Sequence, residues 1–260
     1  MIPEATITAW GVQRPWPNRA AIEQDLLLAR LIVAIYEHPF LREELVFRGG
    51  TCLHQVHLPQ PLRYSEDLDF VRRTHDGIGP VFDALRDVAE RLGLEVKGTD
   101  IGQHPKIRLR APAEGAPGIW LRIKVEINTH ETSPARNLER VPFSVASSWF
   151  TGQADILTFT PAELVSTKLR ALFQRRKGRD LFDLWLALTV LGLDPAEIVD
   201  CFDPYRPDGY TRDRAIENLN EKVDNESFRT DLDLLVTAWP TAYTVEAAAK
   251  LIIDRVFSLL

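Results

Sequence analysis

The chain has 260 residues with a net charge of −6, and 45% of its residues are hydrophobic and 26% charged. This is an ordinary composition for a soluble globular protein, and the length allows one large domain or two small ones. The acidic balance argues against a protein that coats nucleic acid non-specifically, but it allows a local basic patch.

Cysteine content and hydropathy argue against further classes of protein. Cys52 and Cys201 lie far apart in the sequence, so they indicate neither a disulfide framework nor a zinc motif. The first residues lack the charged and apolar regions of a leader peptide, and no apolar run reaches the roughly 18 residues of a membrane span. We therefore expect a cytoplasmic protein without a membrane partner.

Hydrophobic periodicity predicts helices and strands in turn through the first part of the chain. Asn18 is a typical N-cap residue, and apolar residues follow it at three- and four-residue steps as far as Glu37. A short buried strand over 45–47 then runs into Gly49 and Gly50. The later predicted elements are a short helix over 51–57, a strand over 67–71, a helix over 81–92 and strands over 94–97, 106–110 and 120–128.

The glycine pair and the Asp-x-Asp that follows it are the most informative features. On a strand, Asp67 and Asp69 point to the same face. Two convergent carboxylates suit Mg²⁺, which proteins often hold through one or two carboxylates together with substrate phosphates. The turn at Gly49 and Gly50 allows backbone N–H groups to approach phosphate oxygens closely. Together the features predict chemistry on a nucleotide, whereas either alone is also typical of an ordinary exposed turn or strand.

The segment 120–128 shows the clearest alternation in the chain. Its apolar residues occupy every second position, and Glu126 lies on the opposite, polar face. If this strand neighbours the one that carries Asp67 and Asp69, three carboxylates meet. The alternative is an ordinary solvent-facing glutamate between basic neighbours.

From Phe159 onward the pattern becomes helical. Thr160 is a predicted N-cap, followed by Pro161 at the first helical position and Glu163 three residues after the cap. The sequence therefore predicts an α+β protein, with a mixed β-sheet lobe over 1–155 and an α-helical lobe over 156–260. Further helices are predicted over 179–191, from Asp194, and over 211–222, 228–238 and 244–260.

Lys168 lies at the edge of the apolar stripe of the first of these helices, because Leu164 and Leu172 are each one turn away. A lysine in this position often extends along apolar surface to place its ammonium in water. The functional alternative is a point charge that reaches the triphosphate of a nucleotide across a cleft between the lobes.

A cluster of charged residues follows Lys168. Asp180 and Asp183 share a helical face, and favourable interaction with the helix dipole accounts for Asp180 better than for Asp183. The basic residues of the cluster suit either contacts with RNA phosphates or a solvated turn between two helices. These residues are Arg170, Arg175, Arg176, Lys177 and Arg179.

These motifs, taken together and in this order, resemble the AbiEii/AbiGii-type nucleotidyltransferase toxins of the DNA polymerase β-like superfamily. The resemblance extends from about Leu45 to about Leu188. Its most specific block is the last, which pairs a helical lysine with a downstream Arg-Asp-x-x-Asp. The blocks are Phe47-Arg48-Gly49-Gly50-Thr51-Cys52-Leu53 with Arg63-Tyr64-Ser65-Glu66-Asp67-Leu68-Asp69-Phe70, then Lys124-Val125-Glu126-Ile127, then Glu163-Leu164 through Lys168 and Arg175 to Arg179-Asp180-Leu181-Phe182-Asp183-Leu184.

The resemblance implies a role for each matching residue. In the sheet lobe, the glycine pair shapes a phosphate turn, Ser65 helps to hold phosphates, Asp67 and Asp69 bind Mg²⁺, and Glu126 is a third acidic residue that assists deprotonation of the attacking hydroxyl. In the helical lobe, Lys168 contacts the nucleotide and Asp183 is an essential aspartate. The active site would then lie in the cleft between the lobes.

The resemblance also implies an activity and partners. The expected reaction transfers a nucleoside monophosphate from an NTP to an acceptor hydroxyl, at the 3′ end of tRNA, with growth arrest as the result. A cognate antitoxin protein is the expected partner.

Three alternatives stay open at the level of sequence. The same chemistry could act on a protein acceptor, or the chain could bind nucleotide without catalysis. A phosphatase of the haloacid dehalogenase kind is also compatible with Asp67-Leu68-Asp69-Phe70-Val71, although that motif usually follows an apolar central strand, and here Arg63-Tyr64-Ser65-Glu66 precedes it.

Overall fold

A computed structural model describes residues 2–260 of the chain. The chain forms two compact units: unit 1 comprises Met1–Thr132 and Leu138–Thr158, and unit 2 comprises Ser133–Asn137 and Phe159–Leu260. The sequence placed a single division near Asp155 and gave no sign that the short segment 133–137 groups with the helical unit. None of the helices in the described part of the chain combines the length and apolar character that a bilayer crossing requires.

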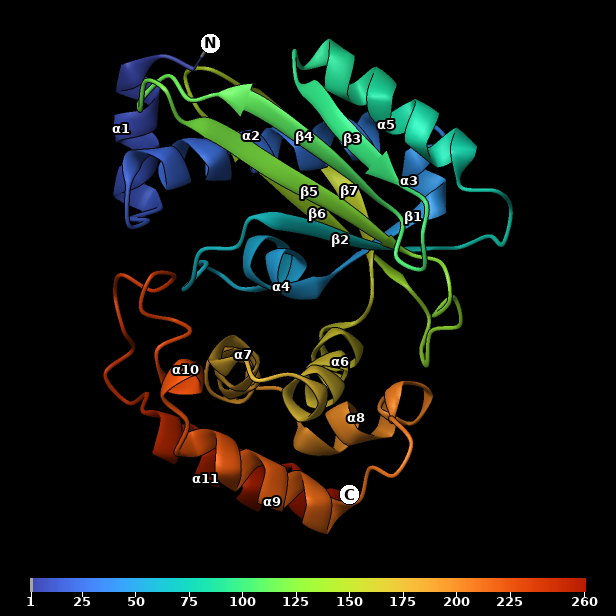
Figure 1. Ribbon diagram of the computed structural model, residues 1–260, viewed down its shortest axis with the longest axis vertical. Coiled ribbons are helices and arrows are strands. Elements are labelled where there is room, and N and C mark those ends of the chain that lie inside the picture. The colour runs from blue at the N-terminus through green and yellow to red at the C-terminus, as the bar shows by residue number, and fades with distance from the viewer. Residues whose placement is uncertain (1) are drawn as a thin grey trace. The chain divides into compact units, whose positions relative to one another are not determined.

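Unit 1 is built on a seven-stranded mixed sheet (Figure 1). The strand order is β3-β4-β5-β2-β1-β7-β6, with β2–β5 and β1–β7 parallel and the other pairs antiparallel. Its elements are α1 (Glu4–Gln13), α2 (Arg19–Glu37), α3 (Leu41–Glu44), β1 (Leu45–Arg48), α4 (Gly49–Cys52), a π-helical turn (Leu53–His57), β2 (Asp67–Arg72), α5 (Gly79–Arg91), β3 (Glu95–Asp100), β4 (Lys106–Pro112), β5 (Trp120–Asn128), β6 (Glu139–Ala146) and β7 (Thr151–Thr158).

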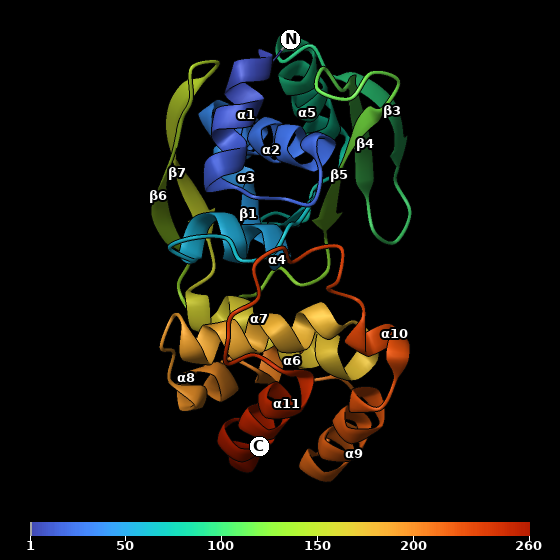
Figure 2. The same cartoon turned by 90° about the vertical axis from the view of Figure 1, so that its left-hand side faces the viewer.

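The core of unit 1 lies between the sheet and a group of three helices, α1, α2 and α5 (Figure 2). Helix α2 begins as expected, because the Asn18 side chain accepts a hydrogen bond from the Ala21 N–H. The alternate residues Leu121, Ile123, Val125 and Ile127 of β5 are all buried, which confirms the alternation read from the sequence.

The hairpin β6–β7 and helix α1 were not predicted. β6 is the edge strand of the sheet and contains Pro142, a residue that edge strands tolerate but that argues against a strand when only the sequence is seen. Helix α1 carries Gly11 and lacks an apolar stripe, so it gives no clear helical period.

Unit 2 is helical and begins with a capped helix, as expected. The Thr160 hydroxyl accepts the Glu163 N–H, and Asp194, Thr211 and Thr244 cap later helices in the same way. The elements are α6 (Pro161–Gln174), α7 (Gly178–Thr189), α8 (Pro195–Asp200), a 3₁₀ turn (Asp203–Tyr205), α9 (Arg212–Val223), α10 (Glu226–Arg229), α11 (Val245–Arg255) and a last 3₁₀ turn (Phe257–Leu259).

One prediction about these helices is wrong. The helix expected over 228–238 is replaced by the short α10 and a run of turns, in which Asp231 accepts the Arg179 N–H (3.2 Å) and so serves the start of α7. Glu163 does not reach back to its own cap. Its buried carboxylate instead accepts the N–H groups of Ala135 (2.6 Å) and Arg136 (3.0 Å), which explains why 133–137 belongs to unit 2.

Candidate active site

The glycine turn at the end of β1 packs directly against the predicted metal ligands. Gly49 has φ +82°, a backbone conformation that suits glycine. A Cβ at Gly49 would overlap the carboxylate of Asp69, lying 3.0 Å from its Cγ, and a Cβ at Gly50 would overlap the buried guanidinium of Arg63. Both glycines are therefore required by close packing.

Ser65 lies beside this turn. Thr51, the residue after the glycines, has its Oγ1 atom 2.8 Å from Ser65 Oγ and hydrogen-bonded to the backbone carbonyl of Asp67. This contact joins the glycine turn to the residue pair that begins β2. Gly49, Gly50, Ser65 and the two aspartates thus form one local structure in unit 1.

Strand pairing brings the three predicted carboxylates to one region of the sheet. β2 and β5 are parallel neighbours, and Asp69 lies opposite Glu126 in their register while Asp67 lies opposite Lys124. Lys124 Nζ lies 3.0 Å from Asp67 Oδ2 and 3.2 Å from Glu126 Oε2. An ammonium group therefore bridges two of the three carboxylates.

The pKa values of these groups reflect this crowding. Burial raises the pKa of Asp69, and the charges of Asp67 and Glu126 raise it further, against the opposing effect of Arg48 and Lys124. Burial disfavours the charged form of Lys124, but its contacts with Asp67 and Glu126 outweigh this and raise its pKa. The region is thus a set of close anionic groups that a cation stabilises.

The same residues pass a simple test for a divalent cation. Within residues 2–260 no three Asp, Glu, His or Cys side chains form a preassembled metal-binding cluster. Mg²⁺, however, is commonly bound by only one or two carboxylates together with waters and substrate phosphates. The oxygen donors of Asp67 and Asp69 suit that ion, and the ammonium of Lys124 already stands as a cation among the carboxylates.

Arg48, which directly precedes the two glycines, is a further charged neighbour of Asp69. The two residues lie opposite each other on β1 and β2. Arg48 Nη1 donates to Glu131 Oε2 (2.7 Å), and Asn128 Nδ2 donates to the same oxygen (2.9 Å). Arg48 is thus held in place by the segment that follows β5. The polar face of β5 was the available signal for Lys124.

In unit 2, Lys168 and Asp183 form a buried ion pair. Lys168 Nζ lies 2.8 Å from Asp183 Oδ2 and 3.5 Å from Asp180 Oδ1, and both aspartates are fully buried. Lys168 itself is only 5% exposed, so it does not extend its ammonium into water as the alternative interpretation had it. These charges pair α6 with α7. They bring together the lysine and the Arg-Asp-x-x-Asp motif, which are separate in the sequence.

The basic segment between α6 and α7 is partly neutralised by carboxylates. Arg175 makes two hydrogen bonds to Asp180 (2.6 and 2.7 Å), which the helix-dipole interpretation of Asp180 did not predict. Lys177 and Arg179 both pair with Asp231, at 3.2 and 3.1 Å. Arg176 is exposed, and Arg170 lies over the Tyr205 ring. Five basic residues with the two carboxylates of Asp180 and Asp231 leave this region net positive.

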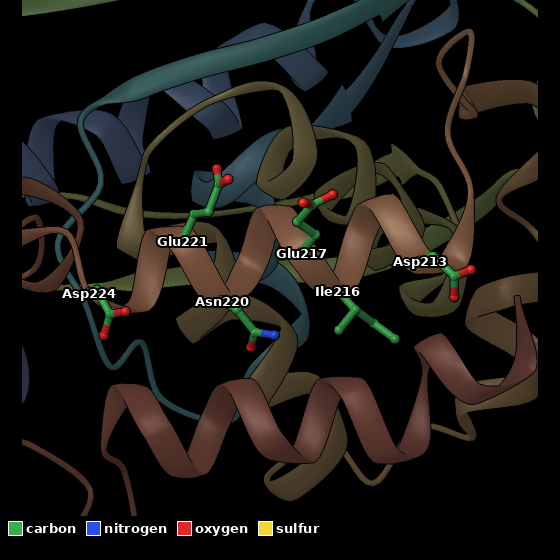
Figure 3. A pocket seen from close by; sticks show the side chains of 6 residues that line it. All are labelled: Asp213, Ile216, Glu217, Asn220, Glu221 and Asp224. Atoms are coloured by element: carbon green, nitrogen blue, oxygen red, sulfur yellow. The ribbon is translucent and has the colours of Figure 1, made fainter.

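A shallow depression along α9 has the opposite character. Figure 3 shows the six side chains that line it, four of which are acidic: Asp213, Ile216, Glu217, Asn220, Glu221 and Asp224. Its negative charge would repel phosphate groups. This surface is therefore no candidate for nucleotide binding.

The phosphatase interpretation does not fit the strand geometry. Asp67 is the first residue of β2, so the Asp-x-Asp begins the strand rather than following a central one. The nucleophile of that interpretation would then lie at the wrong end of the strand.

Comparison with solved structures shows the fold. The chain is similar to the nucleotidyltransferase toxin MenT4 of Mycobacterium tuberculosis H37Rv, with a TM-score of 0.63 and 19% identity over 100% of this chain and 91% of MenT4. It is also similar to JHP933 of Helicobacter pylori, with a TM-score of 0.51 and 17% identity over 94% of this chain and 95% of that one. A comparison with curated protein sequences finds no match.

Comparison with protein families shows the family. The model of the family described as "Nucleotidyl transferase AbiEii toxin, Type IV TA system" matches residues 30–249, which include the glycine turn, both acidic strands and the Lys168–Asp183 pair. The chain therefore belongs to the AbiEii family of nucleotidyltransferase toxins of type IV toxin–antitoxin systems.

Proposed function

We propose that this nucleotidyltransferase moves a nucleoside monophosphate from an NTP to the 3′ end of tRNA, which blocks translation and growth. The reaction depends on Mg²⁺ in this proposal and takes place in the cytoplasm. A cognate antitoxin protein is the natural partner of a toxin from a type IV system.

The single observation that carries the proposal is the arrangement around Asp69. A glycine turn without room for a side chain presses against its carboxylate, and two further carboxylates lie on the same and the neighbouring strand. Asp67 and Asp69 would hold Mg²⁺, which would supply Lewis-acid stabilisation of the negative charge on the phosphates. Ser65 and the turn at Gly49 and Gly50 would hold phosphate oxygens through their hydrogen-bond donors.

Glu126 and the buried Lys168 supply the remaining roles in the reaction. The acceptor oxygen bonds to the α-phosphorus while the bond to the pyrophosphate oxygen breaks, and Glu126 accepts the proton of the attacking hydroxyl. Lys168 offsets the charge that develops on the leaving pyrophosphate through its ammonium, which the carboxylates of Asp183 and Asp180 flank at 2.8 and 3.5 Å. Asp183 fixes the position of that ammonium.

An RNA acceptor is supported by the net positive segment between α6 and α7. Arg176 is exposed, and the exposed part of Arg175 and Lys177 is available to phosphate oxygens although each is also paired with a carboxylate. Arg170 and Arg179 flank this segment and complete the proposed RNA contact.

The test is incubation of the protein with Mg²⁺, each radiolabelled NTP in turn, and either total RNA or cell protein. We expect label in tRNA. Label only in protein would replace the RNA acceptor with a side-chain acceptor. Tight binding of NTP with no transfer under any condition would identify a binding module and contradict the proposal.

A further inference from the structure

Unit 2 contains an aromatic group that the proposed mechanism does not use. Tyr243 packs edge-on against Phe182 and Trp185, with ring centroids 4.8 and 5.3 Å apart. Trp239 stacks on Tyr243 with its ring centroid 5.5 Å away and an interplanar angle of 22°. The result is a layered set of rings that ends in Trp239.

Trp239 is the exposed member of this group. Its exposed fraction is 43%, whereas Phe182, Trp185 and Tyr243 are all buried. Large aromatic side chains usually bury their area in a core or an interface. Trp239 lies instead in the connection between α10 and α11, which Figure 2 shows as an irregular segment. Its ring stacks on Tyr243 and stays partly accessible.

This set of stacked rings lies close to the basic segment of unit 2. Arg179 and Phe182 are three residues apart on α7, so they share a helical face about one turn from each other. Asp231 pairs with Arg179, and Trp239 contacts Phe182 at a centroid distance of 6.0 Å, so the connection after α10 runs beside α7 from its cations to its aromatic residues. Aromatic rings next to a cationic groove are typical of surfaces that bind single-stranded nucleic acid.

The stacked rings are also close to the buried ion pair of Lys168 and Asp183. Burial raises the pKa of Tyr243, and the neighbouring charges of Asp183 and Glu246 raise it further. The Tyr243 hydroxyl is buried, and among residues 2–260 it has no hydrogen-bond partner. The stacked rings thus adjoin a buried polar group whose hydrogen bond is not made within the described residues.

We infer that Trp239, stacked on Tyr243, is a platform for an unpaired nucleobase whose phosphates face the cations at the start of α7. The ligand class is a nucleobase that carries phosphate, supplied either by the terminal nucleotides of the RNA acceptor or by the NTP. This inference rests on the proposed function, because it gives the polynucleotide or nucleotide of that reaction a contact in unit 2.

The test measures binding without catalysis. The full-length protein, without Mg²⁺, is titrated with a fluorescent single-stranded RNA that ends in CCA and, separately, with an NTP. Trp239→Ala should weaken binding of one of them by about 5- to 150-fold, the range for loss of one base–aromatic stack, while Trp239→Phe retains most of the affinity. A loss for RNA alone assigns the platform to the acceptor, and a loss for NTP alone assigns it to the donor.

Two comparisons separate stacking from other effects. The Trp239→Ala loss should disappear when the RNA carries abasic terminal residues, or when inorganic triphosphate replaces NTP. Trp120→Ala is the matched control, because Trp120 is exposed to the same degree (41%) but lies on β5. Equal affinity of the wild type and Trp239→Ala for both ligands, or an equal loss with abasic RNA and inorganic triphosphate, would overturn the inference.

The test of the platform and the test of the proposed reaction give results that can be told apart. Binding that depends on Trp239 but is followed by no transfer in the presence of Mg²⁺ would contradict the proposed reaction and support the platform. Transfer by Trp239→Ala with wild-type affinity for both RNA and NTP would support the reaction and contradict the platform.

Discussion

Gly49 faces Asp69 so closely that a Cβ on the glycine would overlap the carboxylate. Gly49→Ala should therefore combine two penalties: about 1–2 kcal/mol for the left-handed backbone conformation and about 1–3 kcal/mol for the overlap. We expect loss of transfer activity together with a lower free energy of unfolding, measured by urea denaturation.

Gly118→Ala is the control for the backbone penalty alone. Gly118 has φ +83°, but no atom lies within 4 Å of a Cβ built there. Transfer activity should survive in that variant. If Gly49→Ala is as active and as stable as Gly118→Ala, the packing of the turn against Asp69 has no functional weight.

Asp69→Asn should abolish transfer without unfolding the protein. Because the pKa of Asp69 is raised in the folded state, the folded protein binds its proton more tightly than the unfolded chain does. The contribution of Asp69 to stability is thus fully present below its ordinary pKa, near 3.8, and is lost as the pH rises through the higher folded value. At neutral pH Asp69→Asn should match or exceed the wild type in free energy of unfolding.

Two measurements check the prediction for Asp69. The stability difference between Asp69→Asn and the wild type should shrink as the pH falls below about 4. Addition of Mg²⁺ with NTP should raise the melting temperature of the wild type but not that of the variant. An inactive variant that is also strongly destabilised at neutral pH would show that Asp69 is structural.

Lys168→Ala should destabilise the protein as well as impair its activity. Removal of the ammonium leaves the buried carboxylates of Asp183 and Asp180 without their shared partner, and breaking a buried pair typically costs about 3–5 kcal/mol. Lys168→Arg keeps the charge and should fold. Its transfer rate should nevertheless fall, since the broader guanidinium cannot occupy the same position.

Lys250→Ala is the matched control for loss of a lysine in unit 2. Lys250 pairs with Asp254 at 2.7 Å, but on an exposed helix face, so its loss should change stability by less than about 0.5 kcal/mol. Equal stability of Lys168→Ala and Lys250→Ala would contradict the buried-pair account. Wild-type kinetics in Lys168→Arg would show that the reaction does not require a lysine at this position.

Lys124→Met tests whether the ammonium and a divalent cation share one place. The exposed pairs of Lys124 with Asp67 and Glu126 are worth up to about 1 kcal/mol, so their removal should tighten Mn²⁺ binding by up to about fivefold. Binding is measured by electron paramagnetic resonance of free Mn²⁺. Lys106→Met, which removes a lysine paired with Asp100 on β4, should leave it unchanged. Weaker Mn²⁺ binding in Lys124→Met would contradict competition.

Local signals in the sequence predicted much of this fold. The alternation over 120–128 predicted the bounds of β5 correctly, and Asn18 and Thr160 cap the helices that they were expected to cap. These features depend only on neighbouring residues. The α+β class and the mixed sheet followed from them.

The features that the sequence did not reveal depend on residues distant in the chain. Where a helix was predicted over 228–238, the chain forms the short α10 and a series of turns, and Asp231 in this segment accepts the N–H of Arg179, 52 residues away. Glu163 satisfies the backbone of Ala135 and Arg136 instead of its own cap. No local pattern distinguishes such a carboxylate from an exposed one.

The candidate site, too, was only partly predictable from the sequence. The Asp-x-Asp and the glycine pair were visible as a motif, but the cation between the carboxylates was not, because Lys124 meets Asp67 only through the pairing of β2 with β5. The sequence placed Lys168 at the edge of an apolar stripe, but it could not show the burial of Lys168 against Asp183, which depends on α7.

The most direct test of the central claim compares two positions of a radioactive label on the same NTP. With Mg²⁺ and purified tRNA, label at the α-phosphate should enter RNA and label at the γ-phosphate should leave as pyrophosphate, with neither seen for Asp69→Asn. Transfer of the γ-label to RNA, or α-label incorporation by Asp69→Asn at the wild-type rate, would contradict nucleotidyl transfer at this site.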